Sequence, residues 1–121
     1  MESQKKVILV VDDIEQNVTV ISQILRSNVY QVLAAFRGEQ ALKMLEKRTP
    51  DLILLDVMLP DINGFEVCKR IKQNKSISDI PIIFLSALSE AETKVEGLEV
   101  GGVDYITKPF GMMEFVARVK A

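Results

Sequence analysis

The stretch Asp51-Leu-Ile-Leu-Leu-Asp56 places four consecutive large apolar residues directly before a carboxylate. Continuous apolar runs of this length are typical of parallel strands that helices cover on both faces. Two further runs have the same character, Lys6-Val-Ile-Leu-Val-Val11 and Pro81-Ile-Ile-Phe-Leu85. We therefore expect these three runs to be the central strands of one parallel sheet.

Two weaker runs mix polar and apolar residues and suit less buried strands of the same sheet, Tyr30-Gln-Val-Leu-Ala-Ala35 and Val103-Asp-Tyr-Ile-Thr107. Between the runs, apolar residues recur with helical spacing. The helical stretches are 18–25, 41–45, 65–71, 91–98 and 112–119. This regular alternation predicts an α/β fold with a doubly wound, five-stranded parallel sheet and helices on both faces.

The length and composition favour a single domain. A chain of 121 residues with 48% hydrophobic and 26% charged residues is typical of one globular unit, so residues 1–121 are assigned to one domain. No apolar run approaches the roughly 20 residues of a membrane-spanning helix, and the start lacks a signal-peptide pattern, which favours a cytoplasmic protein without membrane contact. The last helical stretch reaches residue 121 without a capping signal, so we expect this helix to be truncated and the parent protein to continue.

The charge balance and the missing residue types restrict the chemistry. A net charge of -2 offers no basic surface for nucleic-acid phosphates, so we expect no direct nucleic-acid binding by this chain. The single cysteine, Cys68, excludes an internal disulfide and a Cys-only zinc site, and the absence of histidine removes the commonest base and metal ligand. Any site must therefore use carboxylates, hydroxyls or lysine.

Polar residues follow the predicted strands at the points where the strands end. Because ligands of open parallel sheets bind beyond the carboxyl ends of the strands, we expect these residues to gather at one edge. In sequence order, these residues are Asp12, Asp13, Asp56, Ser86, Lys108 and Pro109.

Taken singly, most of these residues have an ordinary structural explanation. Asp12 or Asp13 is well suited to cap the first helix. Ser86 suits a turn or cap hydroxyl, and Lys108 a surface ion pair. Asp56 differs, because it directly follows an apolar run, where an unpaired buried charge is costly. Asp56 therefore needs a partner.

Three neighbouring carboxylates repel one another, so they either hold protons or bind a cation, and the cation is the simpler answer. A hard ion such as Mg²⁺ takes about six oxygen ligands, including carboxylates, water and substrate phosphate, and requires no histidine. A hydroxyl and an ammonium group at the same edge suit a bound phosphoryl group. The pattern predicts a metal-assisted phosphate acceptor with Asp56 as the nucleophile.

Five ordered motifs identify a resemblance over nearly the full length. They are Val-Val-Asp12-Asp13, Leu-Leu-Asp56-Val-Met-Leu-Pro60, Gly64, Leu85-Ser86-Ala87, and Asp104-Tyr105 followed by Lys108-Pro109-Phe110. In these motifs the chain resembles the receiver domain of two-component response regulators, of the chemotaxis-regulator type. The resemblance implies the flavodoxin-like strand order 2-1-3-4-5 and a phosphorylation-dependent signalling switch.

The resemblance also implies how the phosphoryl group arrives. Asp56 would take it from the phosphohistidine of a sensor histidine kinase or a phosphotransfer protein. A Mg²⁺ or Mn²⁺ ion would be held by Asp13, Asp56 and the Met58 carbonyl, with Asp12 acting mainly through water. The domain would catalyse its own phosphorylation and dephosphorylation and would not otherwise be an enzyme.

A second set of residues would respond to the phosphoryl group. Ser86, the backbone N–H of Ala87 and Lys108 would contact its oxygens. Tyr105 would turn inward behind Ser86, and a cis peptide between Lys108 and Pro109 would orient the lysine. The surface around the fourth helix, fifth strand and fifth helix would then change and regulate an output domain or an effector protein.

Two positions near the acceptor vary among receivers. They are the second residue after the acceptor, here Met58, and the second after the hydroxyl, here Leu88. Both are apolar. We expect them to shield the acyl phosphate from water and to lengthen its life.

Two alternative functions remain. A Mg²⁺-dependent phosphohydrolase would use the same aspartyl-phosphate intermediate, but enzymes of the haloacid-dehalogenase type usually carry a second Asp where this chain has Met58, and they also carry a substrate cap. A non-phosphorylated interaction module would have lost the chemistry, whereas this chain retains all of Asp12, Asp13, Asp56, Ser86 and Lys108.

Overall fold

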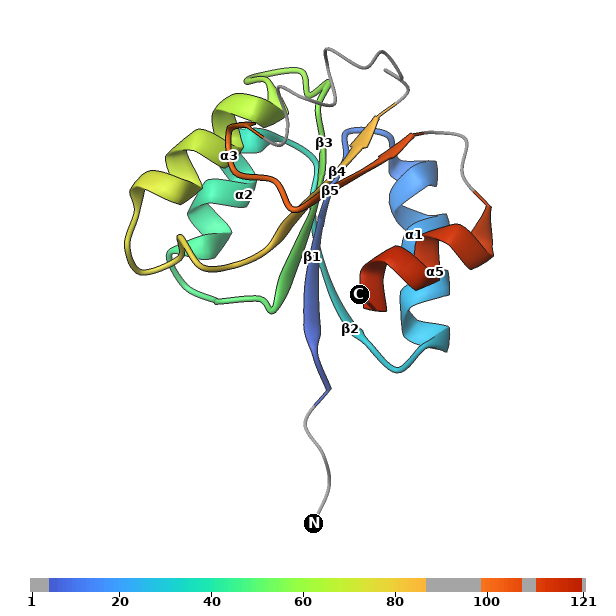
Figure 1. The fold of residues 1–121 in the computed structure, drawn as a ribbon. Helices are drawn as coiled ribbons and strands as arrows, with labels where there is room; N and C mark the ends of the chain where they lie inside the picture. Colours follow the sequence, from blue (N-terminus) through green and yellow to red (C-terminus); the bar gives the residue numbers. More distant parts are fainter. Residues whose placement is uncertain (1–4, 87–98, 108–110, 121) are drawn as a thin grey trace.

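The computed structural model describes residues 5–86, 99–107 and 111–120 (Figure 1). The elements in these ranges are β1 (Val7–Val11), α1 (Glu15–Ser27), β2 (Gln31–Ala35), α2 (Gly38–Leu45), β3 (Leu52–Asp56), α3 (Gly64–Gln73), β4 (Ile82–Ser86), β5 (Asp104–Thr107) and α5 (Met112–Lys120). All five predicted strands are confirmed, with bounds within one residue of those expected. The helix predicted over 91–98 lies outside the described residues.

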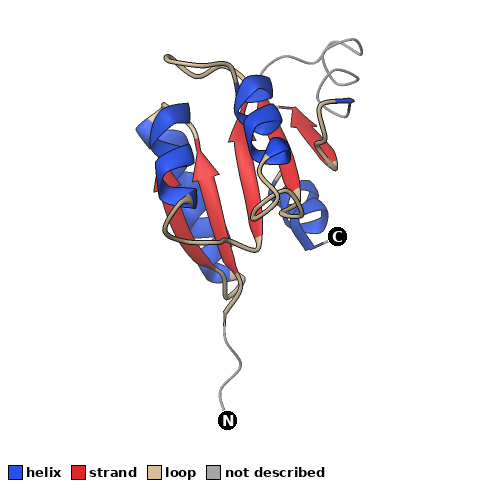
Figure 2. Ribbon diagram, turned by 90° about the vertical axis from the view of Figure 1, so that its left-hand side faces the viewer, coloured by secondary structure: helices blue, strands red, loops and turns tan. Residues whose placement is uncertain are grey.

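The five strands form one parallel sheet in the order β2-β1-β3-β4-β5, which confirms the order implied by the resemblance. Figure 2 shows the strands running in the same direction across the twisted sheet. β1 lies between β2 and β3, so the chain reverses its winding direction there. In such sheets this switch point opens a crevice at the carboxyl ends of the strands.

Helices cover both faces of the sheet. α1 and α5 lie on one side, and α2 and α3 lie on the other (Figure 1). Successive side chains of a strand point to opposite faces. Leu9 and Val11 of β1 therefore pack in the core beneath α2 and α3, whereas Ile8 and Val10 pack in the core beneath α1 and α5.

The central strands are buried along their whole length. Every residue of β3 and of β4 is buried, including the polar residues that end them, Asp56 and Ser86. Continuous apolar runs suit such strands because both of their faces meet helices. Across the part of the chain that the structure describes, no helix combines the length and the apolar character needed to cross a membrane.

Candidate functional site

Three carboxylates meet at the carboxyl ends of β1 and β3. Asp12 and Asp13 directly follow β1, and Asp56 is the last residue of β3, its neighbour in the sheet. One carboxylate oxygen from each residue lies within 4.8 Å of the other two. Asp12 is fully buried and Asp56 is 5% exposed, whereas Asp13 is open to solvent. The structure thus brings together the three acidic residues predicted to share a site.

Asp12 is held by the start of α1. Its Oδ1 accepts a hydrogen bond from the Ile14 backbone N–H at 3.0 Å, and its Oδ2 accepts one from Asn17 Nδ2 at 3.3 Å. Ile14, the N-cap residue of α1, has no side-chain oxygen to offer the helix. The prediction that Asp12 or Asp13 caps the first helix is therefore wrong, because Ile14 is the N-cap residue; Asp12 instead supports the turn into α1 and lies in the acidic cluster.

Asp56 lies at the entrance to the loop that joins β3 to α3. Its Oδ1 accepts a hydrogen bond from the Met58 backbone N–H at 3.0 Å. The base of the loop is closed by a hydrogen bond from the Gly64 N–H to the Val57 carbonyl at 2.8 Å. Met58 is 61% exposed, so it lies at the surface, while its backbone contacts Asp56.

Two hydroxyl-bearing residues lie next to the acidic cluster. Ser86 ends β4, is fully buried, and follows Leu85, the register partner of Asp56. Tyr105 of β5 is 6% exposed, so its side chain lies inward. Burial raises the pKa of Tyr105, a hydrogen bond with the Ser86 side chain opposes that rise, and the negative charge of Asp56 adds to it.

The structure therefore places Asp12, Asp13, Asp56, Met58, Ser86 and Tyr105 around one edge of the sheet. The other predicted site residues lie outside the described residues. They are Ala87, Leu88, Lys108 and Pro109.

Sequence reasoning missed two polar residues that support the site. Asn17 donates to Asp12, and Asp61 ties the loop after Asp56 to the start of α2. Asn17 follows Asp12 by five residues, and Asp61 directly follows Pro60. Both spacings are common in proteins, so neither predicts a contact unless the three-dimensional course of the backbone is known.

The donor set fits a hard divalent cation. The oxygens of the cluster are carboxylate oxygens within one ion's reach of each other, and two of the three carboxylates are almost completely buried. Mg²⁺ and Mn²⁺ favour oxygen ligands of this kind. A cation at this position would neutralise buried negative charge that is otherwise costly.

The comparisons with known proteins agree with this geometry. Residues 8–120 match the family model of the response regulator receiver domain. The chain is 52% identical over 116 residues to the alkaline phosphatase synthesis transcriptional regulatory protein PhoP of Bacillus subtilis, covering 96% of this chain and 48% of that protein. It is 41% identical over 114 residues to the response regulator PleD of Caulobacter vibrioides, covering 94% of this chain and 25% of that protein. The chain thus spans half or less of these curated relatives.

Solved structures give the same assignment. The BeF3-activated DrrB receiver domain matches with a TM-score of 0.87 and 35% identity, over 97% of this chain and 96% of that one. The chemotaxis response regulator CheY4 of Vibrio cholerae matches with a TM-score of 0.92 and 29% identity, over 97% and 98% of the two chains. The chain belongs to the response regulator receiver domain family of two-component signalling.

Proposed function

We propose that this domain is a phosphorylation-dependent switch in which Asp56 accepts a phosphoryl group from the phosphohistidine of a sensor histidine kinase or a phosphotransfer protein. One observation carries the proposal. The carboxylates of Asp12, Asp13 and Asp56 lie within 4.8 Å of one another, at the switch point where such sheets bind ligands. Membership of the receiver family supports the same chemistry.

Asp13, Asp56 and the Met58 carbonyl would hold a Mg²⁺ or Mn²⁺ ion, with Asp12 acting mainly through water. When bound, the ion supplies positive charge that lets an anionic phosphoryl group approach the acidic edge. Asp12 is kept in place for this role by Ile14 and Asn17. Asp56 is kept in place by the Met58 N–H.

In the transfer step, one carboxylate oxygen of Asp56 attacks phosphorus. The P–O bond to Asp56 forms while the P–N bond to the donor histidine breaks, and the histidine nitrogen leaves with the electron pair. Such transfers depend mainly on positioning and charge stabilisation, so this chain requires no histidine of its own.

After transfer, Ser86, the Ala87 N–H and Lys108 would contact the phosphoryl oxygens. Ser86 is buried beside Asp56, and its hydrogen bond with Tyr105 supports a coupling from the acceptor to β5. The surface around the helix predicted over 91–98, β5 and α5 would carry the change to an output domain or effector. The curated relatives include transcriptional regulators about twice as long as this chain, which supports an output outside it.

Family membership favours the switch over an Mg²⁺-dependent phosphohydrolase, since receiver domains are signalling domains. The close approach of all three carboxylates favours it over a non-phosphorylated interaction module. A cytoplasmic location remains a prediction.

Phosphorylation of Asp56 can be tested directly. The chain is incubated with Mg²⁺ and acetyl phosphate, and the intact mass and peptide map are followed by mass spectrometry. We expect one phosphoryl adduct on Asp56, which does not form when EDTA is present from the start and is absent from Asp56→Asn. Rapid multiple turnover of varied phosphate esters would indicate the hydrolase. No adduct from acetyl phosphate or from a phosphorylated histidine kinase would indicate the passive module.

A further inference from the structure

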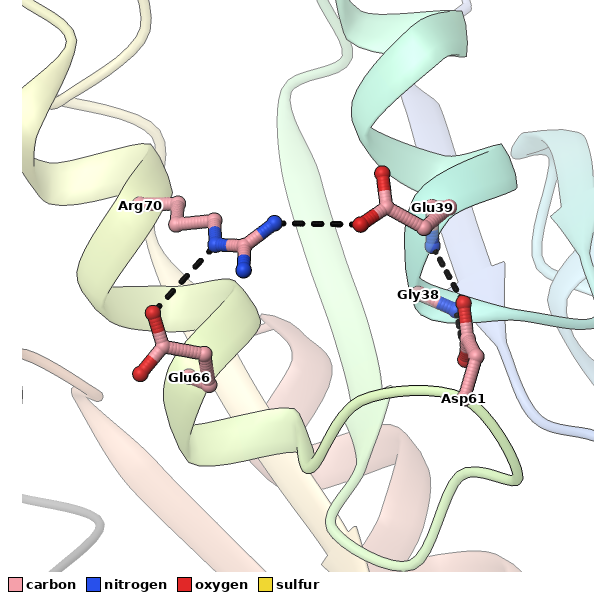
Figure 3. Close-up of polar contacts among 5 residues, drawn as sticks. All are labelled: Gly38, Glu39, Asp61, Glu66 and Arg70. Carbon is pink, nitrogen blue, oxygen red and sulfur yellow. Dashed lines mark hydrogen bonds and ion pairs between the residues drawn. The ribbon is translucent and has the colours of Figure 1, made fainter.

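The loop after Asp56, residues 57–63, is attached to a second helix at its far end. Asp61 Oδ1 accepts a hydrogen bond from the Gly38 backbone N–H at 2.9 Å, and Asp61 Oδ2 accepts one from the Glu39 N–H at 2.8 Å (Figure 3). Both N–H groups belong to the first turn of α2. The helix's own N-cap residue, Arg37, makes no side-chain cap. Asp61 therefore caps α2 from a distant loop.

Both hydrogen bonds are charge-assisted and lie where a helix favours an anion. The first N–H groups of a helix have no partner inside the helix, and the helix dipole adds positive potential there. Desolvation raises the pKa of Asp61, but the hydrogen bonds from the Glu39 and Gly38 N–H groups outweigh it and hold the pKa at about 2. Asp61 thus stays ionised, and the attachment stays intact, at neutral pH.

A packing contact supports the attachment. Gly38 has no side chain, and a Cβ added there would lie 2.5 Å from Ile62 Cγ1 and 2.8 Å from Val67 Cγ2. A side chain at position 38 would therefore require the Ile62 or Val67 side chain to move, and glycine lets the start of α2 lie close against the loop. Two consecutive loop residues, Asp61 and Ile62, hold the loop against the same helix start.

The attached loop begins at the acceptor and carries Met58. The Met58 N–H is bonded to Asp56 Oδ1, so Met58 lies between one anchor two residues before it and a second anchor at Asp61. A short segment anchored at both ends has few conformations left, and preorganised ligands lose less entropy when they bind.

We infer that Asp61 is a positioning residue, which fixes loop 57–63 against α2 and thereby holds the Met58 backbone in place for the divalent ion. This inference rests on the proposed function, because it assigns Asp61 a role in the metal site proposed there. It predicts that removing the attachment weakens ion binding in the unphosphorylated chain, before any transfer step.

Two variants separate this role from a general effect on packing or charge. Arg70 of α3 joins Glu39 of α2 at 3.1 Å and Glu66 at 3.2 Å, so Arg70→Ala loosens the same pair of helices without touching the loop (Figure 3). Glu66→Gln removes one negative charge, as Asp61→Ala does, but from the first turn of α3, outside the loop. Asp61→Asn keeps one acceptor oxygen for the helix start.

The test is Mg²⁺ titration of each variant of the 121-residue chain by calorimetry, with thermal melts to show that each is folded. Mutating a residue that hydrogen-bonds to a metal ligand typically weakens metal affinity roughly 10–100-fold. Because Asp61 acts only through the backbone, we expect Asp61→Ala to bind Mg²⁺ about fivefold more weakly than wild type. We expect Mg²⁺ affinity to fall less than about twofold in Arg70→Ala and Glu66→Gln, and by an intermediate factor in Asp61→Asn. Should Asp61→Ala not fold, Asp61→Asn is compared with the same controls.

Amide hydrogen exchange in metal-free protein gives a second readout, and the Met58 amide should exchange faster in Asp61→Ala than in Arg70→Ala. Equal Mg²⁺ affinity in Asp61→Ala, Arg70→Ala and Glu66→Gln would overturn the inference and leave the proposed function standing. A wild-type chain that binds no Mg²⁺ would overturn both.

Discussion

Gly64 packs directly on the backbone of Asp56. A Cβ added to Gly64 would overlap the Asp56 carbonyl oxygen and would lie 2.9 Å from Val57 Cα. The first residue of α3 thus lies against the peptide of the phosphate acceptor, and a larger residue requires the backbone on one side to move. Gly64, one of the motifs that identified the family resemblance, is explained by this contact.

We predict that Gly64→Ala destabilises the domain and slows phosphorylation of Asp56. Overpacking against backbone costs about 1–3 kcal/mol, and the better helix propensity of Ala returns less than about 1 kcal/mol. The expected net loss is about 1–2 kcal/mol. Urea unfolding measures the stability, and the rate of adduct formation with acetyl phosphate measures the acceptor.

Gly111→Ala is the matched control, because a Cβ at Gly111 meets no atom within 4 Å. We expect its stability to stay within about 0.5 kcal/mol of wild type. Equal effects of the two substitutions would show that the contact at Asp56 is not what selects glycine.

Asp61 should make stability depend on pH in the acid range. Its folded-state pKa of about 2 is below the ordinary value of 3.8, so its stabilising effect is complete above the ordinary value and is lost as pH falls through the folded value. Asp61 is exposed, so solvent screening limits the effect to about 1 kcal/mol at neutral pH. We predict that the stability difference between wild type and Asp61→Ala narrows from pH 5 to pH 2. Other carboxyl groups cancel in this difference, and a constant gap over that range would contradict the prediction.

Lys72 joins α3 to the segment before β4. Its Nζ donates to the Ser78 carbonyl at 2.9 Å and to the Ile80 carbonyl at 3.0 Å. We predict that Lys72→Met, which keeps the apolar stem and removes the donors, costs about 1–2 kcal/mol in urea unfolding. Lys69→Met, at an exposed position of the same helix, is the control. A Lys72→Met loss no larger than that of the control would show that the two hydrogen bonds contribute little.

The sequence predicted the strand ends accurately for a physical reason. β3 and β4 are buried on both faces, so their apolar runs are continuous and stop where the chain reaches the edge of the sheet. Placing Asp56 and Ser86 at the same edge followed from parallel strands alone. The order of the strands could be predicted only from the family resemblance, because apolar periodicity does not show which strands are neighbours.

The contacts of Asn17 and Asp61 could not be predicted in the same way. Asp61 bonds to backbone N–H groups 22 and 23 residues away, so its partners depend on the loop path and on where α2 begins. Asn17 reaches Asp12 only because α1 starts directly after Ile14. Helix starts are set by tertiary packing as much as by local propensity, which explains why the residues that support the carboxylates were missed although the carboxylates were found.

The pKa of Tyr105 should depend on its neighbours Asp56 and Ser86. We predict that in a Tyr30→Phe background, where Tyr105 is the one remaining tyrosine, ultraviolet titration gives a midpoint above the ordinary value of about 10. Asp56→Asn should lower the midpoint, because a negative charge that disfavours tyrosinate is removed. Ser86→Ala should raise it, because the hydrogen bond with Ser86 lowers the pKa. A midpoint that neither substitution changes would show that the titration of Tyr105 is not coupled to Asp56.

The lifetime of the phosphorylated state should depend on positions 58 and 88. Met58 is apolar, lies at the surface and contacts Asp56 through its backbone N–H, and Leu88 lies outside the described residues. Polar side chains at these positions can orient a water molecule toward the acyl phosphate, whereas apolar ones exclude it, so Met58→Asn with Leu88→Glu should speed phosphate loss about tenfold.

Intact-mass measurements after removal of acetyl phosphate time this decay. Met58 is 61% exposed, so replacing it should cost little stability, and a shorter lifetime then reflects chemistry rather than unfolding. Val20→Gln, at a position that is 53% exposed on α1, tests whether any polar surface substitution has the same effect. Decay unchanged in the double variant would show that these side chains do not control the access of water, and the lifetime would then depend on the residues that hold the phosphoryl group itself.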